Sequence, residues 1–264
     1  MELIIAKEPL IRFGAFGGCF ALFAIWELYR ARRPRKQNWG SRWLNNCGIL
    51  VVDVLIVRLA APLLPLGAAL ITEHHEWGLF NVIELPSPAS LIVGFLLLDF
   101  AIYLQHRAFH ALPWCWRLHR VHHADLAFDV TTGVRFHPLE IVLSTLIKIL
   151  LVILLGAPAS LIVIFEVVLN GTSLFNHANI SMPAGLDAVL RRFVVTPDMH
   201  RVHHSAVDRE MNSNFGFNLP WWDHWLGTYR AQPEGGHLSM TVGLEAFRDQ
   251  SETRLDKMLL QPFR

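Results

Sequence analysis

The pentapeptide His-Arg-Val-His-His occurs twice in this chain and constrains its fold more than any other feature. The first copy spans residues 119–123 and the second spans residues 200–204. On a helix, side chains three and four positions apart lie on one face, so we expect each copy to turn its three imidazoles toward a single point. Imidazole is a common ligand of transition metals. The repeat therefore predicts a metal site formed by segments that are far apart in the sequence.

The composition indicates a membrane protein. Hydrophobic residues make up 53% of the 264 residues, charged residues only 17%, and the mean hydropathy is +0.35, which is too apolar for an ordinary soluble domain. The net charge of +1 gives no indication of a nucleic-acid partner. Cys19, Cys47 and Cys115 are isolated and lack CxxC spacing, so neither a disulfide framework nor a cysteine-based metal site is expected.

Three apolar runs in the first half of the chain predict transmembrane helices. They cover residues 13–28, residues 47–71 and residues 90–105. We expect Pro62 and Pro65 to bend the second of these helices. The third run leads directly into the first histidines of the candidate site.

A fourth apolar stretch, residues 139–175, is too long for one span. The sequence Gly156-Ala157-Pro158 divides it into two halves, which predicts a helical hairpin that enters the bilayer and returns. Lys148 and Glu166 lie on different halves, and we expect them to face each other.

A cluster of basic residues follows the first span and predicts the orientation. By the positive-inside rule, a short connection this rich in arginine is cytoplasmic, and counting the spans then places the histidine motifs on the cytoplasmic face as well. The cluster consists of Arg30, Arg32, Arg33, Arg35, Lys36 and, a little further on, Arg42.

The number of candidate ligands predicts two metal ions, because one ion has too few coordination positions for so many imidazoles. An all-imidazole set is neutral, so the bound ions keep much of their charge. This suits oxygen activation and also hydrolysis, and imidazole accepts Fe, Zn, Cu or Ni. The candidates are His106, His110, His119, His122, His123, His177, His200, His203 and His204, with His137 as a possible tenth.

These motifs resemble the fatty acid hydroxylase superfamily, which includes sterol desaturases and alkylglycerol monooxygenase. The resemblance covers residues 99–229 and rests on both pentapeptides and on the segments His106-Arg-Ala-Phe-His110, Phe136-His137-Pro138, Asn176-His177, Asn214-Phe-Gly216 and Trp222-Asp223. It implies a di-iron enzyme that uses O2 to hydroxylate or desaturate a lipid taken from the bilayer, such as a sterol or fatty acyl chain. Electrons would come from a separate donor protein that is cytochrome b5-like, ferredoxin-like or reductase-like.

The sequence departs from the family pattern at three positions. Phe215 replaces the usual Tyr, His224 stands where Arg is common, and Ser173 occupies a position at which some members have a further His. The ligand count is therefore open by one, with His137 or His224 as the alternatives. Asp223 and Asn214 are candidates for orienting the imidazoles.

We therefore expect an all-α, integral-membrane bundle of three spans and a helical hairpin, with a cytoplasmic helical cap that carries a dimetal site. Residues 1–264 are predicted to form one membrane domain, in which residues 90–229 carry the histidine motifs. Two other functions fit the residues, namely a membrane protein that binds or transports metal and a membrane di-zinc hydrolase. No haem, flavin or NAD fingerprint is present.

Overall fold

The structure is a computed structural model that describes residues 7–35, 39–60, 64–83 and 85–264. Regular structure in these ranges is helical, apart from two isolated β-bridges. The all-α prediction is therefore confirmed.

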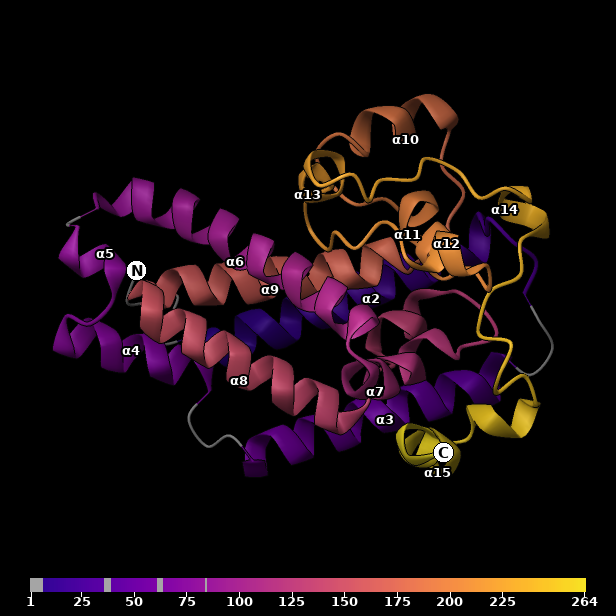
Figure 1. Cartoon of the computed structure of the whole chain (residues 1–264), viewed down its shortest axis with the longest axis horizontal. Coiled ribbons are helices and arrows are strands. Elements are labelled where there is room, and N and C mark those ends of the chain that lie inside the picture. Colours follow the sequence, from indigo (N-terminus) through magenta and orange to yellow (C-terminus); the bar gives the residue numbers. More distant parts are fainter. Residues whose placement is uncertain (1–6, 36–38, 61–63, 84) are drawn as a thin grey trace.

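Four of the described helices are long and apolar enough to cross a membrane: α2 (Glu8–Tyr29), α6 (Ser87–Ala111), α8 (Pro138–Leu155) and α9 (Ala159–Asn176). At 1.5 Å per residue they measure roughly 27–37 Å, which matches a hydrocarbon core of about 30 Å. Figure 1 shows them running along the long axis of the molecule, with α4 and α5 at one end and α11, α12 and α14 toward the other. They contain the predicted first span, third span and hairpin, and the chain is an integral membrane protein.

The predicted second span is wrong as a single bent helix. It consists of α3 (Trp39–Ala60) and α4 (Pro65–His75), and neither is among the four long apolar helices. Pro65 occupies the first turn of α4, where its missing N–H costs nothing, while Pro62 lies outside the described residues. The physical reason is that Leu64, the residue before Pro65, has an extended backbone with ψ 165°, the conformation that a following proline favours.

The hairpin of α8 and α9 turns where the sequence predicts. Gly156 ends α8 with a left-handed φ of 63°, and a Cβ at this position would lie 2.3 Å from the carbonyl oxygen of Trp77. Lys148 donates to Glu166 over 2.8 Å, as predicted, and Arg12 of α2 pairs with the same carboxylate at 2.8 Å. These ion pairs join three helices in a setting where an unpaired charge would be costly.

The remaining helices are short. They are α5 (Leu79–Val82), α7 (Pro113–His123), η1 (Val130–Val134), α10 (Ala184–Leu190), α11 (Pro197–His203), α12 (Asp208–Met211), α13 (Trp221–Trp225), α14 (Gly236–Ser239), η2 (Gln250–Thr253), α15 (Leu255–Leu260) and η3 (Gln261–Phe263). Most of them surround the ends of α6 and α9, where the histidines lie.

A buried ionic network joins α3 to the segment that follows α7. Arg42 donates to Asp125 over 2.6 and 2.8 Å and also contacts Asp129, which caps η1. Burial by itself raises the pKa of Asp125, but the guanidinium groups of Arg42 and Arg135 outweigh this and hold the pKa at about 2. The network therefore remains ionised at neutral pH and fixes the segment next to the first pentapeptide.

Replacement of Arg42 tests the importance of this network. Arg42→Ala leaves the buried carboxylate of Asp125 without its main partner, and we expect the free energy of unfolding to fall by about 3–5 kcal/mol. Unfolding of the detergent-solubilised protein measures the change. The matched control is Arg254→Ala, which removes an exposed pair with Asp256 and should cost less than about 1 kcal/mol. Equal losses in both variants would contradict this role.

Candidate metal centre

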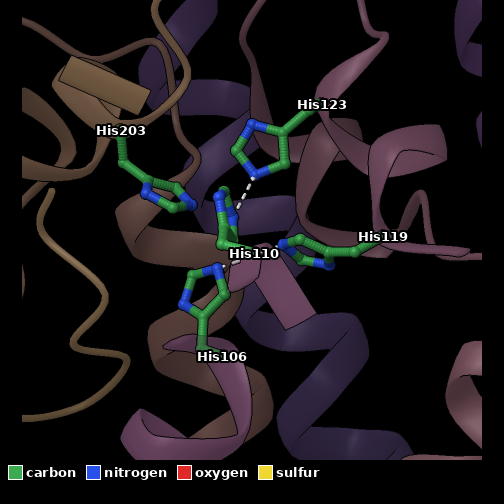
Figure 2. A group of neighbouring side chains, drawn as sticks. All are labelled: His106, His110, His119, His123 and His203. Atoms are coloured by element: carbon green, nitrogen blue, oxygen red, sulfur yellow. Dashed lines mark hydrogen bonds between the residues drawn. The ribbon is translucent and has the colours of Figure 1, made fainter. Parts of the chain in front are cut away.

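Nine histidines form two neighbouring groups at one end of the long helices. Within each group, one ring nitrogen from every member lies within 4.8 Å of those of all the others. Figure 2 shows the rings of the first group pointing toward one another. The first histidine group is His106, His110, His119, His123 and His203, and the second histidine group is His122, His177, His200 and His204.

Each pentapeptide contributes to both groups, so the expectation that each copy faces a single point is wrong. In the first copy, the i and i+4 residues His119 and His123 belong to the first group, and the i+3 residue His122 belongs to the second. In the second copy the assignment is reversed, since His203 alone belongs to the first group. Positions i+3 and i+4 differ by 100° around a helix, which lets adjacent histidines diverge. The two groups are thereby linked through both helices.

Helix ends position these side chains. α6 ends at Ala111, directly after His110 and little more than one turn after His106, and Pro113 starts α7 soon afterwards. α11 begins at Pro197, and the side chain of its N-cap residue Thr196 accepts a hydrogen bond from the backbone N–H of Met199. His177 is the C-cap residue of α9. Four helices therefore converge on the site through their ends, where the chain can change direction.

Oxygen acceptors fix the orientation of five of the nine rings. The Nδ1–H of His119 donates to the Glu140 carboxylate over 2.7 Å, and those of the other four donate to backbone carbonyls. The carbonyl pairs are His106 with Phe215 at 2.8 Å, His122 with Arg135 at 3.3 Å, His177 with Ser173 at 2.7 Å and His203 with Ser213 at 2.8 Å. A proton on Nδ1 leaves Nε2 with a free lone pair, which is the form that binds a metal.

These lone pairs face one another. The Nε2 atoms of His106 and His119 are 3.1 Å apart, as are those of His122 and His177. Because each ring holds its proton on Nδ1, neither contact can be a hydrogen bond between neutral rings. Nε2 of His203 is buried and has no hydrogen-bond partner among the described residues. A cation within each group would satisfy these nitrogens, so the residues present fit bound metal ions.

The four histidines of the second histidine group remain neutral at physiological pH. Burial is the largest cause and neighbouring imidazoles add to it, and together they lower the pKa of His122, His200 and His204 well below the ordinary value. Burial likewise lowers the pKa of His177 to about 4. The second histidine group therefore presents unprotonated imidazoles, to which a metal could bind without competition from protons at pH 7.

His137 was predicted as a possible tenth ligand, but it does not belong to either group. It caps α8: its Nδ1 accepts from the backbone N–H of Leu139, and its Nε2–H donates to the carbonyl of Leu259 over 3.2 Å. Both ring nitrogens are thus engaged away from the site. His224 is exposed and stacks on Tyr229, so neither histidine replaces the one that some relatives have at Ser173.

Aromatic rings line the site, and the motifs that contain Phe136 and Phe215 did not predict this role for them. Phe136 stacks on His122 at 4.4 Å between ring centroids, Phe215 lies 5.2 Å from His110, and Phe128 lies 5.1 Å from His204. These rings keep water away from the ligands. The sequence also did not identify Glu140 as the partner of His119. The position of Glu140, three residues after His137 at the start of a helix, was a signal that could have been used.

Asp223 and Asn214 act through the backbone instead of contacting the imidazoles. Asp223 accepts from the backbone N–H groups of Phe215 and Gly216 over 2.8 and 2.7 Å, which holds the loop whose carbonyl groups receive the histidine protons. A Cβ on Gly216 would lie 2.7 Å from the Asp223 carboxylate, so only glycine allows this approach. Asp99 of α6 accepts from the indole N–H of Trp222 and anchors α13 nearby.

The long apolar helices and the buried all-imidazole donor sets define an integral membrane protein with a histidine-rich site suited to metal ions. The comparison with known families agrees with this class. A family model described as fatty acid hydroxylase matches residues 91–228, more than half of the chain. The chain belongs to the fatty acid hydroxylase family.

Several characterised proteins are similar to this chain. Ornithine lipid hydroxylase OlsE of Rhizobium tropici is 30% identical over 227 residues, covering 80% of this chain and 65% of the relative. Alkylglycerol monooxygenase of Homo sapiens is 28% identical over 179 residues, or 66% and 38% of the two chains. Cholesterol 25-hydroxylase of Rattus norvegicus is 27% identical over 166 residues, covering 62% of this chain and 54% of the relative. The chain thus spans less than two thirds of the length of these relatives. No solved structure gives a significant match.

Removal of one histidine from either group should reduce the metal that co-purifies with the protein. We expect His203→Ala in the first group and His200→Ala in the second each to lower bound metal by about half, because the donor set of one group becomes incomplete. Elemental analysis by mass spectrometry measures the content. His137→Ala and His224→Ala serve as controls that retain full metal. Loss of metal in His137→Ala equal to that in His200→Ala would refute the division into these two groups.

Proposed function

We propose that this protein is a membrane-bound di-iron oxygenase that hydroxylates a lipid with O2 and with electrons from a separate donor protein. Desaturation of the lipid is the alternative outcome of the same chemistry. The nine clustered histidines would be the ligands of two iron ions, one in each histidine group. The whole chain would act as one membrane domain.

The observation that carries the proposal is the pair of buried donor sets in which bare Nε2 atoms face one another. No carboxylate belongs to either set among the described residues, so two bound ions would keep most of their positive charge. Bound iron would supply the activation of O2. Relatives that are named hydroxylase and monooxygenase support an oxygenase over a transporter. The helix-end location of the ligands supports the same choice, since transporter sites lie near the bilayer midplane.

The residues of the chain have three tasks in such a reaction. The carbonyl groups and Glu140 hold the imidazoles in one tautomer, so the ligands need no rearrangement when metal binds. Phe128, Phe136 and Phe215 exclude water, which protects reactive species from side reactions. The apolar helices give a bilayer lipid lateral access to the same end of the protein.

The test is O2 consumption by the purified protein loaded with iron. We expect uptake that requires both a reductant and a lipid extract, and a product lipid heavier by one oxygen atom, detected by mass spectrometry; a loss of two hydrogens would indicate desaturation. A His203→Ala, His200→Ala double variant is the inactive control. Zinc loading with ester or amide hydrolysis and no O2 uptake would instead establish a hydrolase, and metal binding with neither activity would favour a binding or transport protein.

We also propose that the metal centre lies on the cytoplasmic side. Arg32 pairs with Asp198 at 3.1 Å, so the basic connection after α2 and the second pentapeptide are at the same end of the protein. The positive-inside rule then orients both. A cysteine introduced at Arg30 in a cysteine-free background should resist a membrane-impermeant maleimide in intact cells and react after cell rupture. Labelling in intact cells would show the opposite orientation, with the metal centre outside the cytoplasm.

A further inference from the structure

A cavity of about 290 Å³ opens where α2 ends and α3 begins, beside the second histidine group. Arg33, Arg35 and Trp39 lie on its outer side, and Phe128 forms part of its inner wall. Phe128 also contacts rings of the second histidine group, with its centroid 5.1 Å from that of His204 and 5.7 Å from that of His177. The cavity is thus separated from the second histidine group by one aromatic ring.

The acidic side chains in the cavity wall already have partners. Glu27 accepts from the backbone N–H groups of Val130 and Asn179 over 2.7 and 2.6 Å. Asp129 accepts from the indole N–H of Trp43 over 3.1 Å and pairs with Arg42, the third guanidinium of the wall. Neither carboxylate, that of Glu27 or that of Asp129, therefore neutralises the remaining cations Arg33 and Arg35.

Arg33 and Arg35 are the uncompensated charges. Within the part of the chain that the structure describes, no carboxylate lies within ion-pair distance of either guanidinium. Arg33 is half-buried, which lowers its pKa, and its Nη2 donates only to the carbonyl of Met240, over 2.7 Å. Arg35 lies over the ring of Trp39 with 5.4 Å to the centroid. A partly desolvated guanidinium without a counter-charge favours an anion that can accept two hydrogen bonds at once.

The cavity lies at the level of the headgroup layer of a membrane. The candidate span α2 ends at Tyr29, only four residues before Arg33, and Trp39 at the start of α3 is 44% exposed. Tryptophan and arginine at the end of a transmembrane helix are typical of the membrane–water interface. An anion that reaches this cavity from the bilayer would therefore be part of a lipid.

We propose that this cavity binds the anionic headgroup of a membrane lipid, a phosphate or a carboxylate, through Arg33 and Arg35. The proposal rests on the proposed function in one respect: it narrows the lipid substrate to one with an anionic headgroup, held next to the second histidine group. Specificity would then come from the headgroup as well as from the position of the reacting carbon.

Lipid binding tests this without any turnover. The full-length protein in detergent is offered equal amounts of phosphatidylglycerol and phosphatidylcholine with identical acyl chains, and native mass spectrometry counts the bound lipids. We expect a preference of about tenfold for phosphatidylglycerol, lost in Arg33→Gln and in Arg35→Gln. Arg30→Gln is the matched control, because it removes the same charge from an exposed position of the same connection and should keep the preference.

Three results would overturn the proposal: no preference in the unaltered protein, an unchanged preference in both cavity variants, or an equal loss in Arg30→Gln. A further arm adds inorganic phosphate alone. Binding of phosphate without binding of phosphatidylglycerol would assign the cavity to a soluble anion and reject the lipid. Metal content and thermal unfolding of each variant show whether it is folded, and Arg35→Gln alters an exposed side chain that is least expected to disturb folding. Because O2 uptake is measured separately, failure here leaves the proposed function standing.

Discussion

The architecture depends on neutral imidazoles that face one another through their lone pairs in a water-poor interior. Five of the nine rings direct the Nδ1 proton outward to a carbonyl or carboxylate oxygen, so the inward Nε2 of each of these rings carries a lone pair. A cation bound between these nitrogens would satisfy them. The histidines of both groups come from the last turns of α6 and α7, the C-cap of α9 and the short helix α11, so the ends of four helices converge at this point.

Polar residues that would be unfavourable in lipid are used to brace this end of the bundle. Arg42 and Asp125 connect α3 to the segment after α7, and Arg32 and Asp198 connect the α2 connection to α11. Each pair fixes a neighbour of one pentapeptide. The apparent second span is interrupted by a local feature instead: Leu64, which precedes Pro65, has an extended backbone, so α3 and α4 are separate helices.

The two histidine groups are unequal, with five donors in the first and four in the second. The hydroxyl of Ser173 donates to the carbonyl of Gly133, while the carbonyl of Ser173 receives the proton of His177. Ser173 thus orients a histidine of the second histidine group. The smaller group is also the one beside Phe128 and the cationic cavity, so the face of the site with fewer protein ligands is the face with space next to it.

The sequence by itself determined the helical membrane fold, the hairpin at Gly156, the Lys148–Glu166 pair and the set of histidines, because hydropathy, helix-breaking residues and repeated spacing are local properties. It did not determine how each pentapeptide divides between two groups, or that His137 caps α8 instead of joining them. Those features depend on which oxygen each side chain meets across the fold. Such partners lie far away in the chain, and only the tertiary structure brings them within hydrogen-bonding distance.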